Sequence, residues 1–134
     1  MSPLKRSIWL SVIGVACGVL SWVAAVSVSG KFEPFDSSAG LAVNQLVLGL
    51  PAILLACRLR PALLLLYFLG AWFGMNTYAY VFGSSEQRAW ATLGAATSLL
   101  FLGLPVVLAV MTAAIRHIGA RWGAGRGADS QRGK

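Results

Sequence analysis

Residues 61–82 read PALLLLYFLGAWFGMNTYAYVF and carry no charged side chain. A helix of this length measures about 33 Å at roughly 1.5 Å per residue, which matches the roughly 30 Å of a bilayer's hydrocarbon core. The first half is rich in leucine, whereas the second half combines glycines one turn apart with several polar side chains. The segment is therefore predicted to be a transmembrane helix whose second half is unusually polar.

Three further uncharged segments are long enough to cross a membrane. Only 11% of the 134 residues are charged and 57% are hydrophobic, whereas a soluble domain has about 25% charged residues. We therefore predict an all-α, polytopic membrane protein: one antiparallel bundle of four transmembrane helices over residues 1–115. The predicted helices cover residues 7–29, 38–57, 61–82 and 89–115, and residues 116–134 are predicted to form a basic, disordered tail.

The first apolar segment has two interpretations. Ser27-Val-Ser29-Gly30 fits the small-residue cleavage site of a signal peptide. However, the run 7–29 is longer than the roughly 7–15 residues of a signal-peptide core. We therefore expect a retained transmembrane helix rather than a cleaved signal.

Basic residues are distributed unevenly, which predicts an orientation. Lys31 and Arg88 lie in the first and third connections. The N-terminus, the second connection and the tail hold the other basic side chains: Lys5, Arg6, Arg58, Arg60, Arg116, Arg121, Arg126, Arg132 and Lys134. Because positive residues favour the cytoplasmic side, both termini are expected there, in a multi-pass protein of a bacterial cytoplasmic (inner) membrane.

The basic tail is expected to contact anionic lipid at the cytoplasmic face. A basic side chain near such a surface contributes roughly 1 kcal/mol of attraction, and we assign this contact to Arg116, Arg121 and Arg126. Nucleic acid is not an expected partner, because no folded nucleic-acid-binding module accompanies the tail.

Small residues recur on one face of each predicted helix, which indicates close helix packing. The glycines assigned to packing are Gly14, Gly18, Gly49, Gly70 and Gly74. The Gly14–Gly18 pair forms a GxxxG motif, for which packing within the chain is favoured over homodimerisation. Pro51 and Pro105 lie inside predicted helices and are expected to kink them, because proline removes a backbone hydrogen bond.

Polar side chains from all four helices are expected at similar depth. Counting residues inward from the helix ends at roughly 1.5 Å each places them in one slab of the outer leaflet. The predicted layer comprises Ser21, Asn44, Gln45, Asn76, Thr77, Tyr80 and Ser98. Two interpretations remain open: hydrogen bonds that hold the helices together, or a polar cavity that opens outward.

Two short stretches, Ala42-Val-Asn44 and Gly74-Met-Asn-Thr77-Tyr78, resemble the small four-helix fluoride channels. Those proteins have an asparagine in helix two and a Gly-x-Thr-Thr-Phe stretch that breaks helix three. This chain departs from the pattern: Ser21-Trp22 stands where the family has an arginine, and Asn76 replaces the first threonine. Tyr78 and Val81 replace the phenylalanines, and the charge bias is stronger. The resemblance implies a channel.

Catalytic chemistry is not indicated by the sequence. No carboxylate pair, nucleophile–base pair or metal-ligand cluster is recognisable, and His117 stands alone at a predicted membrane edge. We therefore expect no enzyme activity, cofactor or metal. The first functional hypothesis is a small non-catalytic membrane subunit that stabilises or anchors a larger complex, with other membrane subunits or a second copy as partner. The alternative is an oligomeric channel or transporter for a small solute.

Overall fold

The computed structural model describes residues 2–132, with the side chains of residues 2–120, and contains only helices in that range. Its elements are α1 (Pro3–Ser29), a 3-10 turn η1 (Pro34–Asp36), α2 (Ser38–Ala56), α3 (Pro61–Phe82), α4 (Ser85–Ala89) and α5 (Ala91–Arg132). Four of the helices are long and apolar enough to cross a membrane. The all-helical prediction with four candidate spans is therefore confirmed.

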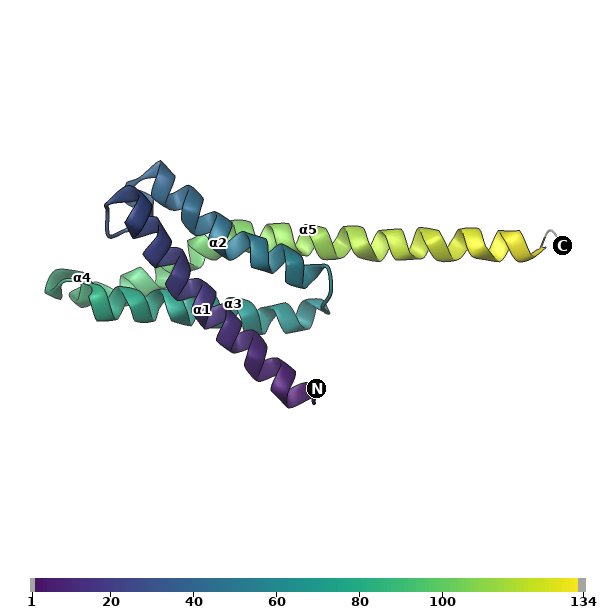
Figure 1. Ribbon diagram of the computed structural model, residues 1–134, viewed down its shortest axis with the longest axis horizontal. Helices are drawn as coiled ribbons and strands as arrows, with labels where there is room; N and C mark the ends of the chain where they lie inside the picture. The colour runs from purple at the N-terminus through teal and green to yellow at the C-terminus, as the bar shows by residue number, and fades with distance from the viewer. Residues whose placement is uncertain (1, 133–134) are drawn as a thin grey trace.

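Each of the four long helices packs against at least two of the others, and α1 crosses α3 at a steep angle. α1 packs against α3 and α2, and α5 packs against the same two helices from the other side. Figure 1 shows the 30–37 connection and α4 at one end of the molecule. The N-terminus, the 57–60 turn and the extension of α5 lie at the other end.

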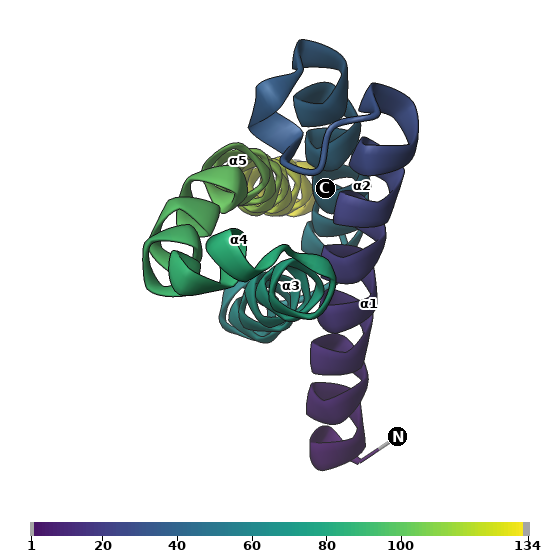
Figure 2. The ribbon, with the colours of Figure 1, turned by 90° about the vertical axis from the view of Figure 1, so that its left-hand side faces the viewer.

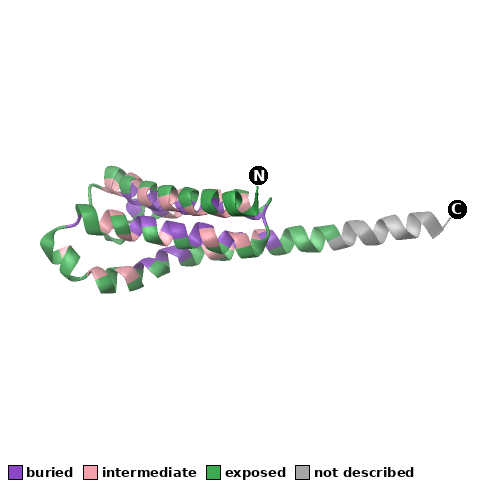
Figure 3. Ribbon diagram, turned by 90° about the horizontal axis from the view of Figure 1, so that it is seen from below, coloured by how far each residue is buried: buried purple, intermediate pink, exposed green. Residues whose placement is uncertain are grey.

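The outer surface of the bundle is apolar, as a bilayer-embedded protein requires. Leu54 and Leu100 are 68% and 78% exposed, and many other large hydrophobic side chains face outward. Buried residues form stripes on the inward faces of the helices (Figure 3). The core contains Leu48, Tyr67 and Met75, which are fully buried.

Helix start signals explain most of the boundaries. α1 begins at Pro3 rather than at residue 7, because the Ser2 side chain accepts a hydrogen bond from the Lys5 backbone N–H and Pro3 suits the first helical position. α3 likewise begins on Pro61. The capping box at Ser84 and Gln87 is present.

The fourth predicted helix differs from the structure at both ends. The capping box starts a separate short helix, α4, which ends at Ala89. Trp90 separates α4 from α5. At the other end α5 does not stop at residue 115 but continues to Arg132, through the segment that we expected to be disordered. Extending an existing helix adds one hydrogen bond per residue without a new nucleus, and no proline after Pro105 stops it.

Candidate functional site

Ser21 on α1 and Asn44 on α2 form the first part of the polar layer. Both side chains are almost completely buried. The Asn44 amide donates to Ser21 Oγ over 3.1 Å, and the Ser21 hydroxyl donates to the Gly18 carbonyl over 2.8 Å. This chain of bonds connects α1 and α2.

Gln45 extends the same network to α5. Its Nε2 donates to the Phe101 carbonyl over 3.0 Å and to Asn44 Oδ1 over 3.2 Å. Pro105 lies four residues after Phe101 and has no N–H, so the Phe101 carbonyl lacks its usual helical donor. Gln45 therefore supplies the bond that the proline removes. Within residues 2–120, Gln45 Oε1 is a buried atom with no hydrogen-bond partner.

A second side-chain donor lies beside the other helix proline. Pro51 leaves the Val47 carbonyl of α2 without its helical donor. The buried Tyr67 hydroxyl of α3 donates to the adjacent Leu48 carbonyl over 2.8 Å. Both prolines lie inside continuous helices, and each has a polar side chain from a neighbouring helix nearby.

Asn76 and Ser98 form a separate group between α3 and α5. Asn76 Nδ2 donates to Ser98 Oγ over 3.0 Å and to the Trp72 carbonyl over 2.7 Å. The Trp72 indole N–H donates to the Ala95 carbonyl over 3.0 Å, which adds a second bond between the same helices.

Thr77 and Tyr80 do not join either group. The Thr77 hydroxyl bonds the Phe73 carbonyl of its own helix, and its side chain is exposed. Tyr80 is 59% exposed. The helix break that the fluoride-channel resemblance implies is also missing, because α3 is continuous from Pro61 to Phe82.

Four of the five packing glycines lie where α1 crosses α3. A Cβ atom built on Gly14 would overlap the Tyr67 carbonyl oxygen, and one on Gly18 would overlap that of Ala71. Gly70 and Gly74 of α3 meet α1 backbone in the same way. The GxxxG motif thus packs within the chain.

Gly49 is the exception among these glycines. A Cβ atom there would meet only the Leu108 Cδ1 atom, at 3.9 Å, which is an ordinary van der Waals contact. Among these five glycines, the backbone approach that requires glycine is therefore found only at the α1–α3 crossing.

A cavity of about 690 Å³ opens at the end of the bundle that carries α4. Its walls come from the 30–37 connection, α1, α3, α4 and α5. Of the predicted layer, only Asn76 and Tyr80 line it. Most of the remaining lining is aromatic or apolar, and two carboxylates, Glu33 and Glu86, also contribute.

The roles of Tyr67 and Trp72, which lie in the middle of an apolar helix, were not predicted from the sequence. A buried tyrosine hydroxyl or tryptophan indole N–H usually has a hydrogen-bond partner, so these two residue types in an apolar helix could have indicated bonds to a neighbouring helix. The cavity was not predictable either, because no sequence pattern marks a space that five separate segments enclose.

Among the three arginines assigned to lipid contact, Arg116 donates to the Leu59 carbonyl over 2.8 Å, which joins α5 to the 57–60 turn. Arg121 and Arg126 lie outside the residues whose side chains are described.

Residues capable of metal binding do not cluster in the described part of the chain. Cys17 and Cys57 are both free thiols. No known family model matches the chain, and no curated protein or solved structure is detectably similar to it.

Proposed function

We propose that the chain is a non-catalytic integral membrane subunit that packs against a larger membrane complex and stabilises or anchors it. The observation that supports this role is the use of the intramembrane polar groups. Ser21, Asn44, Gln45, Asn76 and Ser98 all bond across helices of the same chain. Hydrogen bonds that hold a bundle together occupy donors that a solute pathway or a reaction would otherwise use.

The outer face of α5 is the proposed contact surface. Gly103 is exposed there, and a Cβ atom built on it would meet nothing within 4 Å. Leu100, Leu104 and Val107 surround Gly103 and are more than half exposed. Small residues flanked by large apolar ones allow a second membrane helix to approach closely. Inside the chain, the glycines of α1 and α3 allow those two helices to approach in the same way.

Substitution of Gly103 tests this surface. Gly103→Leu is expected to reduce recovery of a co-purifying membrane partner about tenfold or more, since overpacking a close contact costs roughly 1–3 kcal/mol and each 1.4 kcal/mol is tenfold. The measurement is quantitative mass spectrometry of the complex after mild detergent extraction.

Ala42→Leu is the matched control, because Ala42 is also exposed but lies on α2. It is expected to leave partner recovery unchanged. Equal loss in both variants, or a parent chain that always purifies alone, would contradict the proposed role of α5.

The alternative function, an oligomeric channel or transporter for a small solute, is favoured by one observation: the cavity at the α4 end, which Asn76 and Tyr80 line. The alternative predicts solute flux through the purified chain in liposomes, with loss of flux in Asn76→Leu or Asn44→Leu. If flux is present in both variants, the polar layer does not form the pathway.

The proposed location is a bacterial cytoplasmic membrane, with both termini in the cytoplasm and Arg116, Arg121 and Arg126 near anionic headgroups. The clustering of basic residues at the termini and the 57–60 turn supports this orientation. An alkaline phosphatase fused at Ser85 is expected to be active, and one fused after Arg60 inactive. The reverse pattern would require the opposite orientation.

A further inference from the structure

The floor of the cavity at the α4 end is built from aromatic rings that the fold holds in place. Trp22 and Phe101 are buried, at 6% and 8% exposed, and their ring centroids lie 6.3 Å apart in an edge-on arrangement. The Trp22 indole N–H donates to the Phe32 carbonyl over 2.8 Å, which attaches the 30–37 connection to α1. Phe35 stacks on Phe101 with centroids 5.9 Å apart. These contacts make the aromatic floor a preformed surface.

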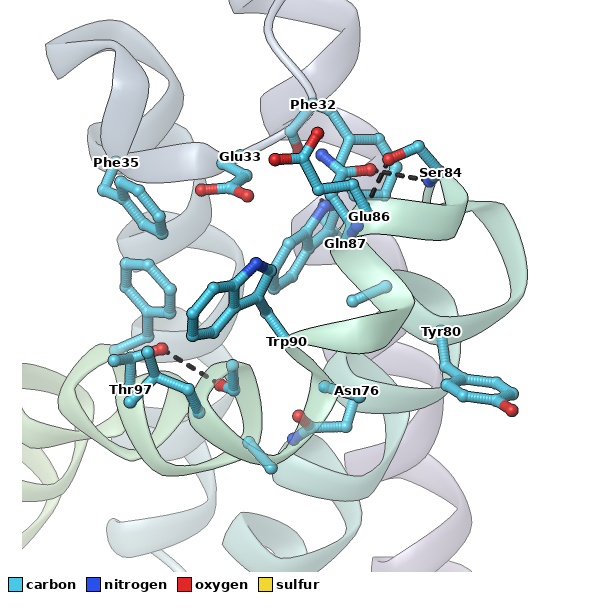
Figure 4. Close-up of a pocket in the computed structure, with 17 residues that line it drawn as sticks. Phe32, Glu33, Phe35, Asn76, Tyr80, Ser84, Glu86, Gln87, Trp90 and Thr97 are labelled. Atoms are coloured by element: carbon cyan, nitrogen blue, oxygen red, sulfur yellow. Dashed lines mark hydrogen bonds between the residues drawn. The ribbon is translucent and has the colours of Figure 1, made fainter.

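Trp90 forms part of the rim. It is 62% exposed and lies at the break between α4 and α5. In Figure 4 its indole ring lies in the middle of the cavity view, between the Phe35 side and the α4 side. A molecule in the cavity would therefore contact the rings of both the floor and the rim.

The charge of the lining is negative. Glu33 from the 30–37 connection and Glu86 from α4 both line the cavity, and in Figure 4 both carboxylates lie above the Trp90 ring. Lysine, arginine and histidine are missing from the lining residues within the described part of the chain. Lys31 and Arg88, the nearest basic residues in sequence, are exposed and lie outside the lining.

Several other polar side chains of the lining already have hydrogen-bond partners, and none of them carries a formal charge. Asn76 bonds Ser98, and the Gln87 and Ser84 side chains bond each other's backbone in the α4 cap. The two carboxylates are therefore the groups that set the charge preference of the cavity.

From this lining we propose that the cavity binds an organic ammonium cation that carries alkyl groups. The faces of aromatic rings attract such cations, and the carboxylates add opposite charge at the rim. A volume of about 690 Å³ lies within the roughly 300–1,000 Å³ typical of small-molecule sites. A bare divalent metal fits less well, because it requires several converging oxygen ligands. This proposal does not depend on the proposed subunit role.

Two sources could supply an alkylated ammonium group: a free cation or the headgroup of a choline lipid. The binding chemistry is the same for both, because rings and carboxylates contact only the ammonium group. Binding in nanodiscs of different lipids distinguishes the free cation from the lipid headgroup.

The experiment measures binding of labelled tetraethylammonium to the full-length chain in maltoside detergent by equilibrium dialysis. Saturable binding is expected, and choline should displace the label. The uncharged isostere 3,3-dimethyl-1-butanol should compete at least about tenfold less well, because a neutral group loses the attraction to rings and carboxylates.

Substitutions in the lining have matched controls in the same chain. The double variant Glu33→Gln/Glu86→Gln is expected to weaken tetraethylammonium binding about tenfold, and Trp90→Leu about fivefold. Asp36→Asn removes a carboxylate from the same connection, and Trp9→Leu removes an exposed tryptophan of α1; neither residue lines the cavity. Both controls should bind as the parent does. If Trp90→Leu does not fold, the double variant Glu33→Gln/Glu86→Gln still provides the test.

The source is distinguished in nanodiscs. Binding that is weaker in phosphatidylcholine nanodiscs than in nanodiscs of phosphatidylethanolamine, which has the same net charge but no N-alkyl groups, indicates a lipid headgroup as the occupant. Equal binding indicates a free cation, and either result supports the proposed chemistry. The proposal is overturned if saturable binding of tetraethylammonium is missing up to about 10 mM, tenfold above a dissociation constant of about 1 mM. It is also overturned if the double carboxylate variant binds as the parent does, or if the neutral isostere competes as well as choline.

Discussion

Alanine at Gly18 is expected to lower the free energy of unfolding by about 1–3 kcal/mol, the usual cost of overpacking. The added Cβ would overlap the Ala71 carbonyl oxygen and lie 2.9 Å from the Ala71 carbonyl carbon. Backbone atoms cannot rotate aside as a flexible side chain would, so α1 and α3 must separate. Gly74→Ala should have a similar effect, because its Cβ would meet the Val15 backbone. Unfolding by sodium dodecyl sulfate, followed by circular dichroism, measures both.

Two glycines of the same chain serve as controls for this prediction. At Gly49 an added Cβ atom meets only Leu108 Cδ1, and at Gly103 it meets nothing within 4 Å. Alanine at these positions should be neutral or stabilising, by up to about 1 kcal/mol through helix propensity. If Gly18→Ala is no more destabilising than Gly49→Ala, the α1–α3 crossing does not hold the fold.

Gln45→Leu is the second substitution with a large expected effect. It leaves the Phe101 carbonyl without a donor, because Pro105 cannot supply one. A buried unsatisfied carbonyl costs roughly 1–3 kcal/mol. The loss should shrink by at least about 1 kcal/mol in a Pro105→Ala background, where residue 105 regains an N–H that can bond the Phe101 carbonyl. A double-mutant cycle for unfolding measures this coupling.

Pro51→Ala provides the matched background for that cycle. Pro51 also lies inside a helix, but its free carbonyl belongs to Val47, and the side-chain donor nearby is Tyr67. Gln45→Leu should therefore cost as much in the Pro51→Ala background as in the parent. Strictly additive effects of Gln45→Leu and Pro105→Ala would show that Gln45 does not replace the missing bond.

Depth along a helix was predictable from sequence, whereas rotation about it was not. Counting residues placed Asn44 level with Ser21, and Asn76 level with Ser98, and the structure joins each pair by a hydrogen bond. Thr77 is one residue from Asn76, so it points about 100° away and lies on an exposed face. In place of one layer, the structure therefore has two separate hydrogen-bonded groups: Ser21, Asn44 and Gln45 form one, and Asn76 and Ser98 form the other.

Other features depended on tertiary contacts that no local pattern specifies. Pro105 marks the Phe101 carbonyl as unpaired in the sequence itself, but only packing determines that Gln45 reaches it. The cavity depends on how the 30–37 connection and α4 fold over the helix ends, which the capping box at Ser84 does not specify. Low apolar content after residue 115 predicted disorder, yet α5 continues to Arg132.

The most direct test of the proposed subunit role is photo-crosslinking in native membranes from position 103, with position 42 as the control. We predict that a photoreactive residue in place of Gly103 joins the chain to a different membrane polypeptide, which mass spectrometry identifies, and that the same residue in place of Ala42 does not. Equal crosslinking at both positions, or crosslinks at 103 only to a second copy of the chain, would contradict this role.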